Sequence, residues 1–234
     1  MAIIMDGNGR WGLLHKNSRT EGHKQGVIAL ENIIKICIEL GVKTLSVYAF
    51  STENWSRPKL EVNTLMFLFK NYLINKKETL NEQGIKLLVS GSKEKIPSYL
   101  LETIESTCKY LENNEKLTLN ICFNYGGRHE IVDAVNSLLN DGYTKITEDD
   151  LSNRMYNNIN SPDLVIRTGG DFRISNFMLW QIAYSELYFT PCLWPDFGRE
   201  EFLKAIYSYQ KRDRRFGGLS NEKIEFYFFF LYLC

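Results

Sequence analysis

The sequence lacks the features that would place it in several large classes of protein. Lys plus Arg equals Asp plus Glu, at 28 each, so it has none of the excess positive charge that nucleic-acid binding requires. No apolar run approaches the roughly 20 residues of a membrane-spanning helix, and Asp6 comes too early for a secretory signal. The five cysteines are odd in number and include no C-x-x-C pair, which argues against a zinc site or a disulfide framework. These absences predict a cytoplasmic protein, at most attached to a membrane surface, with no nucleic-acid partner.

The motifs of four common enzyme classes are missing as well. No G-x-x-x-x-G-K-[ST] is present, which disfavours a P-loop NTPase, and Gly12 falls one residue late for the G-x-G-x-x-G of dinucleotide-binding proteins. There is no G-x-S-x-G nucleophile elbow. There is also no D-D-x-x-D, the acidic motif of the all-helical prenyl synthases. The chemistry must therefore be inferred from the pattern of elements and from where polar residues collect.

What is present is an alternation of short β-branched runs with longer segments of helical period, which is typical of an α/β domain. Strands are predicted at residues 2–5, 44–50, 85–90, 117–123, 164–167 and 186–189. Helices are predicted at residues 23–40, 62–83, 97–111, 129–140, 177–184 and 200–212. Because most of the strands are continuously apolar, we expect a mainly parallel six-stranded sheet with helices on both faces.

The chain is predicted to form one domain, residues 1–218, followed by an aromatic tail, residues 219–234. As a helix, the apolar end of this tail would span about half of a bilayer core, so it could dock on the domain, dip into a membrane surface, or be a disordered or spurious end. The helix at 62–83 is too apolar for one narrow stripe. Either the whole helix is well buried, or one side faces the core while another lines an apolar groove.

Polar residues collect directly after four of the predicted strands, where ligands of open α/β sheets bind. Each of the four loops carries an arginine and three carry glycines, so that five of the eleven arginines lie there: Arg10, Arg57, Arg128, Arg167 and Arg173. Guanidinium groups match phosphate oxygens in bidentate fashion, and glycines let backbone N–H groups approach a phosphate. A single loop of this kind is more often an ordinary turn, but four at one sheet edge favour a phosphate site.

Asp6 stands out among these cations because a carboxylate repels phosphate unless a divalent metal bridges the two. Mg²⁺ commonly uses one or two carboxylates together with substrate phosphates. Asp6 is therefore a candidate magnesium ligand.

The loops, taken in order, closely resemble the signatures of the cis-prenyltransferases, the undecaprenyl and dehydrodolichyl diphosphate synthases. The matching segments are DGNGRW at 6–11 with Arg19 and GHK at 22–24, YAFSTENWSRP at 48–58, NYGGR at 124–128, PDLVIRTGGD at 162–171, RISNF at 173–177, SELYF at 185–189 and WPDF at 194–197. The similarity runs in a single order from residue 2 to about residue 218.

This resemblance implies a Mg²⁺-dependent enzyme that condenses isopentenyl diphosphate sequentially onto an allylic starter such as farnesyl diphosphate, with cis geometry at each new double bond. It implies a hydrophobic tunnel between the sheet and the helices at 62–83 and 97–111. It also implies a homodimer whose long-chain product, a precursor of a lipid glycosyl carrier, is delivered to a membrane, the endoplasmic reticulum if the source is eukaryotic.

The resemblance also assigns roles to individual residues. Asp6 handles magnesium and the diphosphate of the starter, His23 lies near the pyrophosphates, and Glu186 helps to hold the metal. The starter's diphosphate is held by Gly7, Asn8, Gly9, Arg10, Trp11 and Arg19. The diphosphate of isopentenyl diphosphate is held by Arg167, Arg173 and Ser175. A mobile loop near the reacting carbons carries Ser51, Asn54 and Trp55, with Arg57 as a phosphate partner.

Three points stay open in the sequence. The proton-abstracting base is unnamed, since Asn54 is not basic and Ser51 or a diphosphate oxygen are both candidates. Phe123 stands where many bacterial members have a small residue, so it narrows the tunnel or lies elsewhere, and product length is undecided. The alternatives are a non-catalytic partner subunit, although such relatives lose the first aspartate and the second motif, which are present here, and an unrelated phosphate-binding α/β enzyme.

Overall fold

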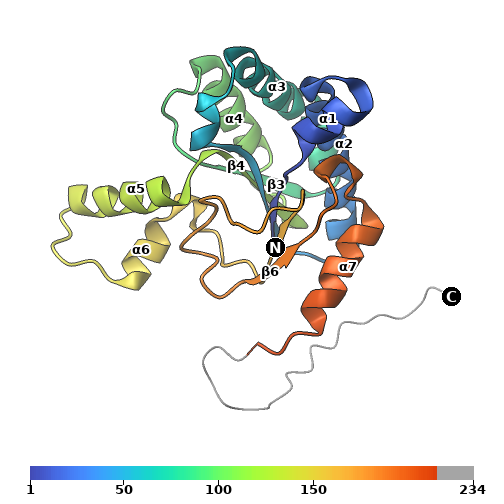
Figure 1. The fold of residues 1–234 in the computed structure, drawn as a ribbon. Coiled ribbons are helices and arrows are strands. Elements are labelled where there is room, and N and C mark those ends of the chain that lie inside the picture. Colours follow the sequence, from blue (N-terminus) through green and yellow to red (C-terminus); the bar gives the residue numbers. More distant parts are fainter. Residues whose placement is uncertain (215–234) are drawn as a thin grey trace.

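The computed structural model describes residues 1–214 and contains one six-stranded sheet in which every pairing is parallel (Figure 1). The strand order is β3-β4-β2-β1-β5-β6. The strands are β1 (Ala2–Ile4), β2 (Thr44–Ser51), β3 (Ile85–Ser90), β4 (Leu117–Tyr125), β5 (Leu164–Arg167) and β6 (Glu186–Phe189). All six predicted strands are therefore confirmed, as is the mainly parallel α/β architecture. The predicted boundary at residue 218 and the aromatic tail lie outside the described residues.

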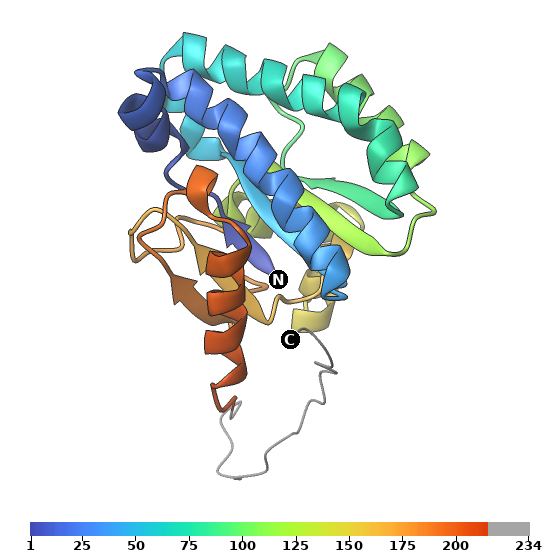
Figure 2. The ribbon, with the colours of Figure 1, turned by 90° about the vertical axis from the view of Figure 1, so that its right-hand side faces the viewer.

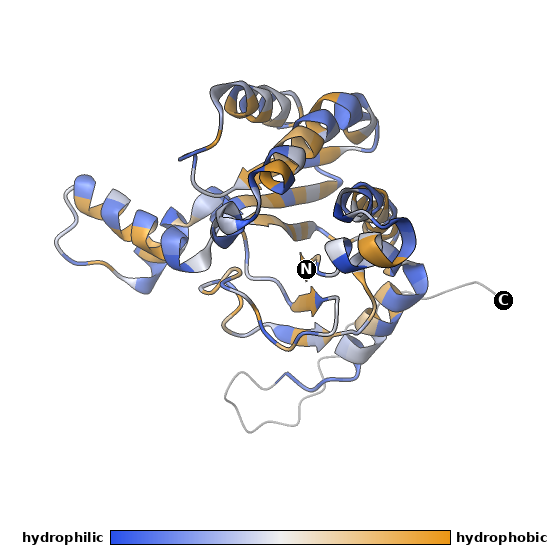
Figure 3. Cartoon of the chain, turned by 45° about the horizontal axis from the view of Figure 1, so that its top comes forward, coloured by the Kyte–Doolittle hydropathy of each residue, from blue (hydrophilic) through white to orange (hydrophobic). Residues whose placement is uncertain are grey.

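Helices cover the sheet from both sides (Figures 1 and 2). They are α1 (Asn8–Lys16), α2 (Arg19–Glu39), α3 (Lys59–Glu82), α4 (Ser98–Tyr110), α5 (Gly127–Asn140), α6 (Glu148–Arg154) and α7 (Arg199–Gln210), with short 3₁₀ helices η1 (Thr52–Ser56), η2 (Tyr156–Asn158) and η3 (Trp194–Asp196). Figure 3 shows the strands as mostly hydrophobic and the helices as mixed, as expected for a sheet buried on both faces. In the described part of the chain, no helix combines the length and the apolarity needed to cross a membrane.

The two faces of the sheet have separate cores because successive side chains of a strand point to opposite sides. Ile3 packs in the larger core, under α2, α3, α4 and α7, whereas its neighbour Ile4 packs in a second core with Tyr125 and Phe177. The register of the central strands then aligns their ends: Ile4 lies opposite Tyr48 of β2 and Arg167 of β5. The loops that follow these three strands consequently open at one edge of the sheet.

The predicted helix at 177–184 is wrong, because this segment is a series of turns. Ser175, Asn176 and Met178 have φ values of 48°, 62° and 44°, in the left-handed region, which interrupts a right-handed helix at its start. The sequence pattern carried no sign of this, since the segment has an apolar period that fits a helix.

Two helices were not predicted, α1 and α6. The first contains Gly9 and Gly12, which lower helix propensity, but Gly12 allows α1 to pack closely on α2: a Cβ added there would lie 2.2 Å from the carbonyl oxygen of Ser18. The second is seven residues long and polar, and it starts at a capping box between Thr147 and Asp150.

The structure separates the two sides of α3. One side enters the core through Met66, Phe69 and Leu73, as expected for a helix that covers the sheet. The other side leaves Phe67 and Ile74 exposed. In the region between the sheet and α3 where the resemblance places a tunnel, Phe123 of β4 is buried and stacks on Phe69 with 4.2 Å between ring centroids. The hydrophobic tunnel therefore stays a prediction.

Candidate functional site

A cavity of about 620 Å³ lies at the sheet edge where the loops after β1, β2 and β5 meet. Its lining consists of Ile4, Met5, Asp6, Gly7, Asn8, Gly9, Arg10, Arg19, His23, Tyr48, Ala49, Ser51, Glu53, Asn54, Arg57, Arg167, Arg173, Ser175 and Asn176. Every residue given a role in the site lines this cavity except Trp11, Trp55 and Glu186. Arg128, one of the five arginines expected at the phosphate site, does not line it either, so the loop after β4 takes no part in this lining. The structure thus brings loops that are more than 100 residues apart in the sequence to one cavity, as expected from the sequence.

The turn after β1 forms the end of the cavity at which α1 begins. Gly7 has a φ of 109°, which only glycine adopts without strain, and its left-handed conformation starts α1 at Asn8. Gly9 leaves room for the guanidinium of Arg19, since a Cβ added at Gly9 would lie 2.7 Å from its carbon. A helix N-terminus with a guanidinium group beside it attracts anions. This end of the cavity therefore suits a diphosphate.

Arg167 anchors the opposite side and holds Asp6 in place. Its guanidinium is buried and donates hydrogen bonds to Oδ2 of Asp6 at 2.8 Å, to Oγ of Ser175 at 2.7 Å and to the carbonyl oxygen of Arg173 at 2.5 Å. Burial raises the pKa of Asp6, but the hydrogen bond and charge of Arg167, and then the charge of Arg10, outweigh it and leave the pKa below its ordinary value. Asp6 is thus a carboxylate at neutral pH.

The fit of a metal ion can be judged from the donor set. Asp6 lines the cavity, and residues 1–214 contain no group of three or more His, Cys, Asp or Glu side chains that could hold a metal by themselves. One carboxylate fits Mg²⁺, which keeps several waters and binds substrate phosphates. The ligands of a Mg²⁺ ion bound here would then be the carboxylate of Asp6 and the phosphate oxygens of a bound substrate.

Glu186 does not share this site within one chain. It begins β6 opposite Leu164, whereas Arg167 lies opposite Phe189 at the other end of the same strand pair. Its carboxylate accepts a hydrogen bond from Arg212 at 2.7 Å. The role of Glu186 as a metal ligand stays a prediction, and a single chain does not bring it to Asp6.

Glu61, which the sequence reasoning missed, lies at the centre of the basic residues on the α2–α3 side. Its carboxylate contacts Arg57 at 3.0 Å, Arg19 at 3.2 Å and His23 at 3.4 Å. Arg57 and Glu61 are four residues apart, but Arg57 precedes α3 in an extended conformation, so the helical pairing rule could not have identified Glu61. Burial raises the pKa of Glu61, but the hydrogen bond from Arg19 and the charges of Arg57 and Arg19 lower it overall. Glu61 fixes these three side chains around the cavity.

The charge of Glu61 should have a measurable effect on the pKa of His23. Burial lowers the pKa of His23, Glu61 raises it, and the charges of Arg57 and Arg19 lower it. Replacing Glu61 by Gln removes the one attractive charge, so the pKa of His23 should fall further below 6.5 in the Glu61→Gln variant. An NMR titration of the imidazole Cε1–H signals measures this, with His15 and His129 as internal controls. A His23 pKa that is unchanged or higher in the variant would show that Glu61 does not govern it.

The η1 segment lines the cavity through Ser51 and Asn54, whereas Trp11 and Trp55 lie outside it. Ser51 and Asn54 form a capping box at η1, in which the Ser51 backbone N–H donates to Oδ1 of Asn54 at 3.1 Å. Trp55 donates through Nε1 to Asn124 at 2.7 Å. Trp11 donates through Nε1 to Asp196 at 2.6 Å. Ser51 and Asn54 therefore face the cavity, while the tryptophans tie its loops to the neighbouring elements.

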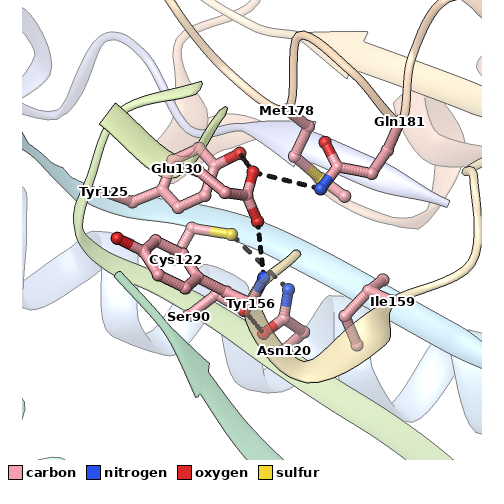
Figure 4. Close-up of a pocket in the computed structure, with 9 residues that line it drawn as sticks. All are labelled: Ser90, Asn120, Cys122, Tyr125, Glu130, Tyr156, Ile159, Met178 and Gln181. Carbon is pink, nitrogen blue, oxygen red and sulfur yellow. Dashed lines mark hydrogen bonds between the residues drawn. The ribbon is translucent and has the colours of Figure 1, made fainter. Parts of the chain in front are cut away.

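A buried polar cluster lies behind the cavity, on the second core's side of the sheet (Figure 4). Glu130 is at its centre and accepts hydrogen bonds from the hydroxyl of Tyr125, from Nε2 of Gln181 at 3.0 Å and from the backbone N–H of Tyr156 at 3.0 Å. Burial raises the pKa of this carboxyl group. The hollow has no room for a water molecule. Glu130 therefore joins β4, α5, η2 and the 175–185 turns, which carry Ser175 into the cavity.

Removing the Glu130 carboxylate should destabilise the fold strongly. In Glu130→Ala, three buried donors lose their acceptor, and each unsatisfied buried group costs about 1–3 kcal/mol. We expect the free energy of unfolding to fall by about 3 kcal/mol in urea denaturation, allowing for relaxation of the site. Glu115→Ala, at an exposed position, serves as the control and should stay within about 0.5 kcal/mol of the unmodified chain. Equal stabilities of the two variants would contradict the structural role of Glu130.

Comparison with known proteins extends over almost the whole chain. Residues 4–217 match the family described as "Putative undecaprenyl diphosphate synthase". The chain is 54% identical over 221 residues to an isoprenyl transferase of Fusobacterium nucleatum, covering 94% of this chain and 96% of that protein. It is 46% identical over 226 residues to an isoprenyl transferase of Thermotoga maritima, covering 94% and 97%.

Two solved structures share the fold. Lavandulyl diphosphate synthase from Lavandula x intermedia, in complex with dimethylallyl diphosphate, superposes with a TM-score of 0.87 at 36% identity, covering 92% of this chain and 96% of that one. A probable undecaprenyl diphosphate synthase from Campylobacter jejuni superposes with a TM-score of 0.80 at 30% identity, with the same coverage. The resemblance seen in the sequence motifs therefore extends to the architecture.

Proposed function

The chain belongs to the cis-prenyltransferase family, and on that premise we propose that it condenses isopentenyl diphosphate sequentially onto farnesyl diphosphate to make a long-chain cis-polyprenyl diphosphate. The observation that carries this proposal is the single cavity in which Asp6 lies between two groups of arginines. Two diphosphate substrates need two cationic subsites, and the reaction needs their hydrocarbon ends side by side.

The allylic starter binds at the α1 end of the cavity. Gly7, Asn8 and Gly9 line it where α1 begins, a place where backbone N–H groups have no partner within the helix, and the guanidinium of Arg19 lies over Gly9. Arg10, with half of its side chain exposed, can turn from Asp6 to the bound phosphate. That the lavender relative binds dimethylallyl diphosphate, an allylic diphosphate, supports this assignment.

Isopentenyl diphosphate binds at the β5 end, beside Arg167, Arg173 and Ser175. Arg167 cannot move freely, because its buried guanidinium already bonds to Asp6 and Ser175, so it presents a fixed positive charge. Arg173 is 62% exposed and can close on the ligand. In this arrangement the allylic carbon of the starter and the nucleophilic carbon of isopentenyl diphosphate would meet near Asp6. The C–C bond forms there as the allylic C–O bond breaks, the diphosphate leaves, and isopentenyl diphosphate loses a proton.

The reaction requires stabilisation of the departing diphosphate and exclusion of water. Mg²⁺ held by Asp6 would neutralise charge on the leaving diphosphate, as divalent ions commonly do. The arginines on both sides of Asp6 act in the same direction, since fixed cations stabilise charge that develops in the transition state. Ser51, whose side chain faces the cavity, and a diphosphate oxygen are the two candidates to accept the proton from isopentenyl diphosphate.

A direct assay tests this function. The purified chain is incubated with farnesyl diphosphate, labelled isopentenyl diphosphate and Mg²⁺, and the butanol-extractable label is analysed. We expect elongated prenyl products from the chain alone. A lack of elongation across a range of detergents, with restored activity on adding a second prenyltransferase chain, would instead support a non-catalytic partner subunit.

Product length should depend on the aromatic stack under α3. Phe123 lies between Phe69, at 4.2 Å, and Phe50, at 5.3 Å between ring centroids, and fills the space in which a growing chain would extend. Phe123→Leu frees part of this space, so the longest product should gain at least one isoprene unit in mass analysis. Phe202→Leu, a change at an equally buried residue of α7, is the matched control and should leave product length unchanged. Identical product distributions for both variants would place the growing chain elsewhere.

We propose two partners for the enzyme, a membrane surface and a second copy of the chain. A long-chain polyprenyl diphosphate is an amphiphile, so we propose that the enzyme releases it at a membrane surface. We also propose a homodimer, in which Glu186 would act across the interface between two copies. Analytical ultracentrifugation of the purified chain tests the second proposal.

A further inference from the structure

One helix carries an exposed apolar row outside the cavity. Leu60, Phe67 and Ile74 of α3 are 80%, 61% and 53% exposed. They are seven residues apart, so they share one face of the helix and form a row about 21 Å long. We call these three residues the α3 row. Figure 2 shows α3 at the outside of the molecule, on the far side of the α2 layer from α7. Asn63 and Asn71 lie between the three side chains, so the row consists of spaced apolar groups and is not one continuous patch. Their alignment on one helix face sets them apart from scattered exposed apolar residues, which need no explanation.

The charges around the α3 row are mostly positive. Residues 59–77 contain four lysines, of which Lys76 pairs with Glu31, while Lys59, Lys70 and Lys77 form no ion pair within the described residues. The one carboxylate in this stretch, Glu61, is turned toward Arg19 and Arg57 with 13% of its side chain exposed. The next carboxylate, Glu78, is exposed four residues after Ile74 and accepts a hydrogen bond from the hydroxyl of Tyr110. Over residues 59–78, the outer face of α3 therefore carries Lys59, Lys70 and Lys77 against the single exposed carboxylate of Glu78, which leaves it with a net positive charge.

Exposed aromatic side chains of α4 border the same surface. The ammonium groups of Lys70 and Lys77 lie 4.7 Å and 4.0 Å from the ring centres of Tyr99 and Tyr110. Tyrosine and lysine beside an apolar stripe are the composition of helices that lie in a membrane interface, where the apolar groups enter the acyl region and the cations meet anionic headgroups. A two-fold contact between copies of this face would instead bring like charges together.

We propose that the outer face of α3 binds an anionic lipid bilayer, with the α3 row inserted at the headgroup boundary and Lys59, Lys70 and Lys77 against the headgroups. The choice of a bilayer as partner rests on the proposed function, because the product is a lipid. Arg57, two residues before α3, lines the cavity and pairs with Glu61 in the first turn of α3, so a docked α3 would hold the substrate site next to the bilayer. The released hydrocarbon chain then has a short path to lipid.

Vesicle co-sedimentation of the full chain tests this proposal without substrate. We expect binding to phosphatidylcholine vesicles that contain 30 mol% phosphatidylglycerol, and at least fivefold weaker binding to phosphatidylcholine alone. The triple variant Leu60→Ser/Phe67→Ser/Ile74→Ser should bind the anionic vesicles at least tenfold more weakly. Lys59→Gln/Lys70→Gln/Lys77→Gln should also lose at least tenfold, since each lysine near an anionic surface contributes about fivefold.

Matched controls use exposed residues on other elements. Val132→Ser/Leu139→Ser on α5 removes two side chains that are 55% and 53% exposed, and Lys35→Gln/Lys43→Gln/Lys145→Gln removes three exposed lysines. Both controls should bind vesicles like the unmodified chain. The proposal is overturned if the α3 variants bind equally well, if the unmodified chain ignores anionic vesicles, or if the apolar variant changes only the oligomeric mass in light scattering.

The same proteins separate this proposal from the enzymatic one. Condensation activity is measured in detergent solution without vesicles, where the α3 variants should match the unmodified chain. Vesicle binding without condensation would leave the α3 surface intact and refute the proposed function. Condensation activity together with equal vesicle binding by all variants would support the proposed function and refute the α3 surface.

Discussion

Asp6→Ala should lower the turnover number by at least about a hundredfold, because removing one group that stabilises transition-state charge typically has an effect of this size. Asp6 is the carboxylate on which the two arginine groups converge, with Arg167 at 2.8 Å and Arg10 at 3.4 Å. The variant also leaves the buried Arg167 guanidinium without a partner at Nη2 other than Asp171, at 3.5 Å. Steady-state kinetics with saturating farnesyl diphosphate and isopentenyl diphosphate measures the change.

Asp171→Asn is the matched control for Asp6→Ala. Asp171 also pairs with arginines of the site, Arg173 at 2.6 Å and Arg167 at 3.5 Å, but it does not line the cavity. We expect less than a tenfold change in turnover for this variant. If Asp171→Asn and Asp6→Ala were equally impaired, the loss would reflect a general disturbance of the arginines rather than a function of Asp6.

Arg167→Lys should lower kcat/KM for isopentenyl diphosphate by about a hundredfold or more, although the charge is kept. The planar guanidinium of Arg167 bonds simultaneously to Asp6, Ser175 and the carbonyl oxygen of Arg173. An ammonium group has no rigid fork and cannot reproduce these directions, so the position of Asp6 and of the 173–175 backbone would both change. Initial rates at varied isopentenyl diphosphate concentration measure the effect.

Arg199→Lys provides the control for this arginine substitution. Arg199 forms a surface pair with Glu39 in which both side chains are 54% exposed, and exposed pairs contribute little. Its kcat/KM should stay within about twofold of the unmodified value. A loss in Arg167→Lys as small as this would mean that charge alone, without the geometry of the fork, suffices at the β5 end of the cavity.

The sheet was predictable because its strands are continuous apolar runs, and the site because four arginine-bearing loops follow them. Parallel strands place their carboxyl ends together, so Asp6 and Arg167 could be assigned to one edge from their positions after β1 and β5. The distance between them could not be predicted, since it depends on the register in which Ile4 lies opposite Arg167.

The features that escaped prediction depend on conformation or on tertiary contacts. The turns at 175–178 look helical by hydrophobic period, and their left-handed φ values appear only in the folded chain. Glu61 was overlooked because its role depends on Arg19 and His23, about 40 residues away in sequence, as well as on Arg57. Glu186 follows the motif of the family, yet its strand places it at the opposite end of the sheet from the cavity.

The central claim is that one cavity holds two diphosphates on either side of Asp6. A crystal structure of the chain with Mg²⁺, isopentenyl diphosphate and the unreactive thio analogue of farnesyl diphosphate tests it most directly. The expected result is one diphosphate at the turn of Gly7–Gly9 beside Arg19, and the other beside Arg167 and Ser175. Either diphosphate bound outside this cavity, or a cavity that accepts one diphosphate and excludes the second, would contradict the claim.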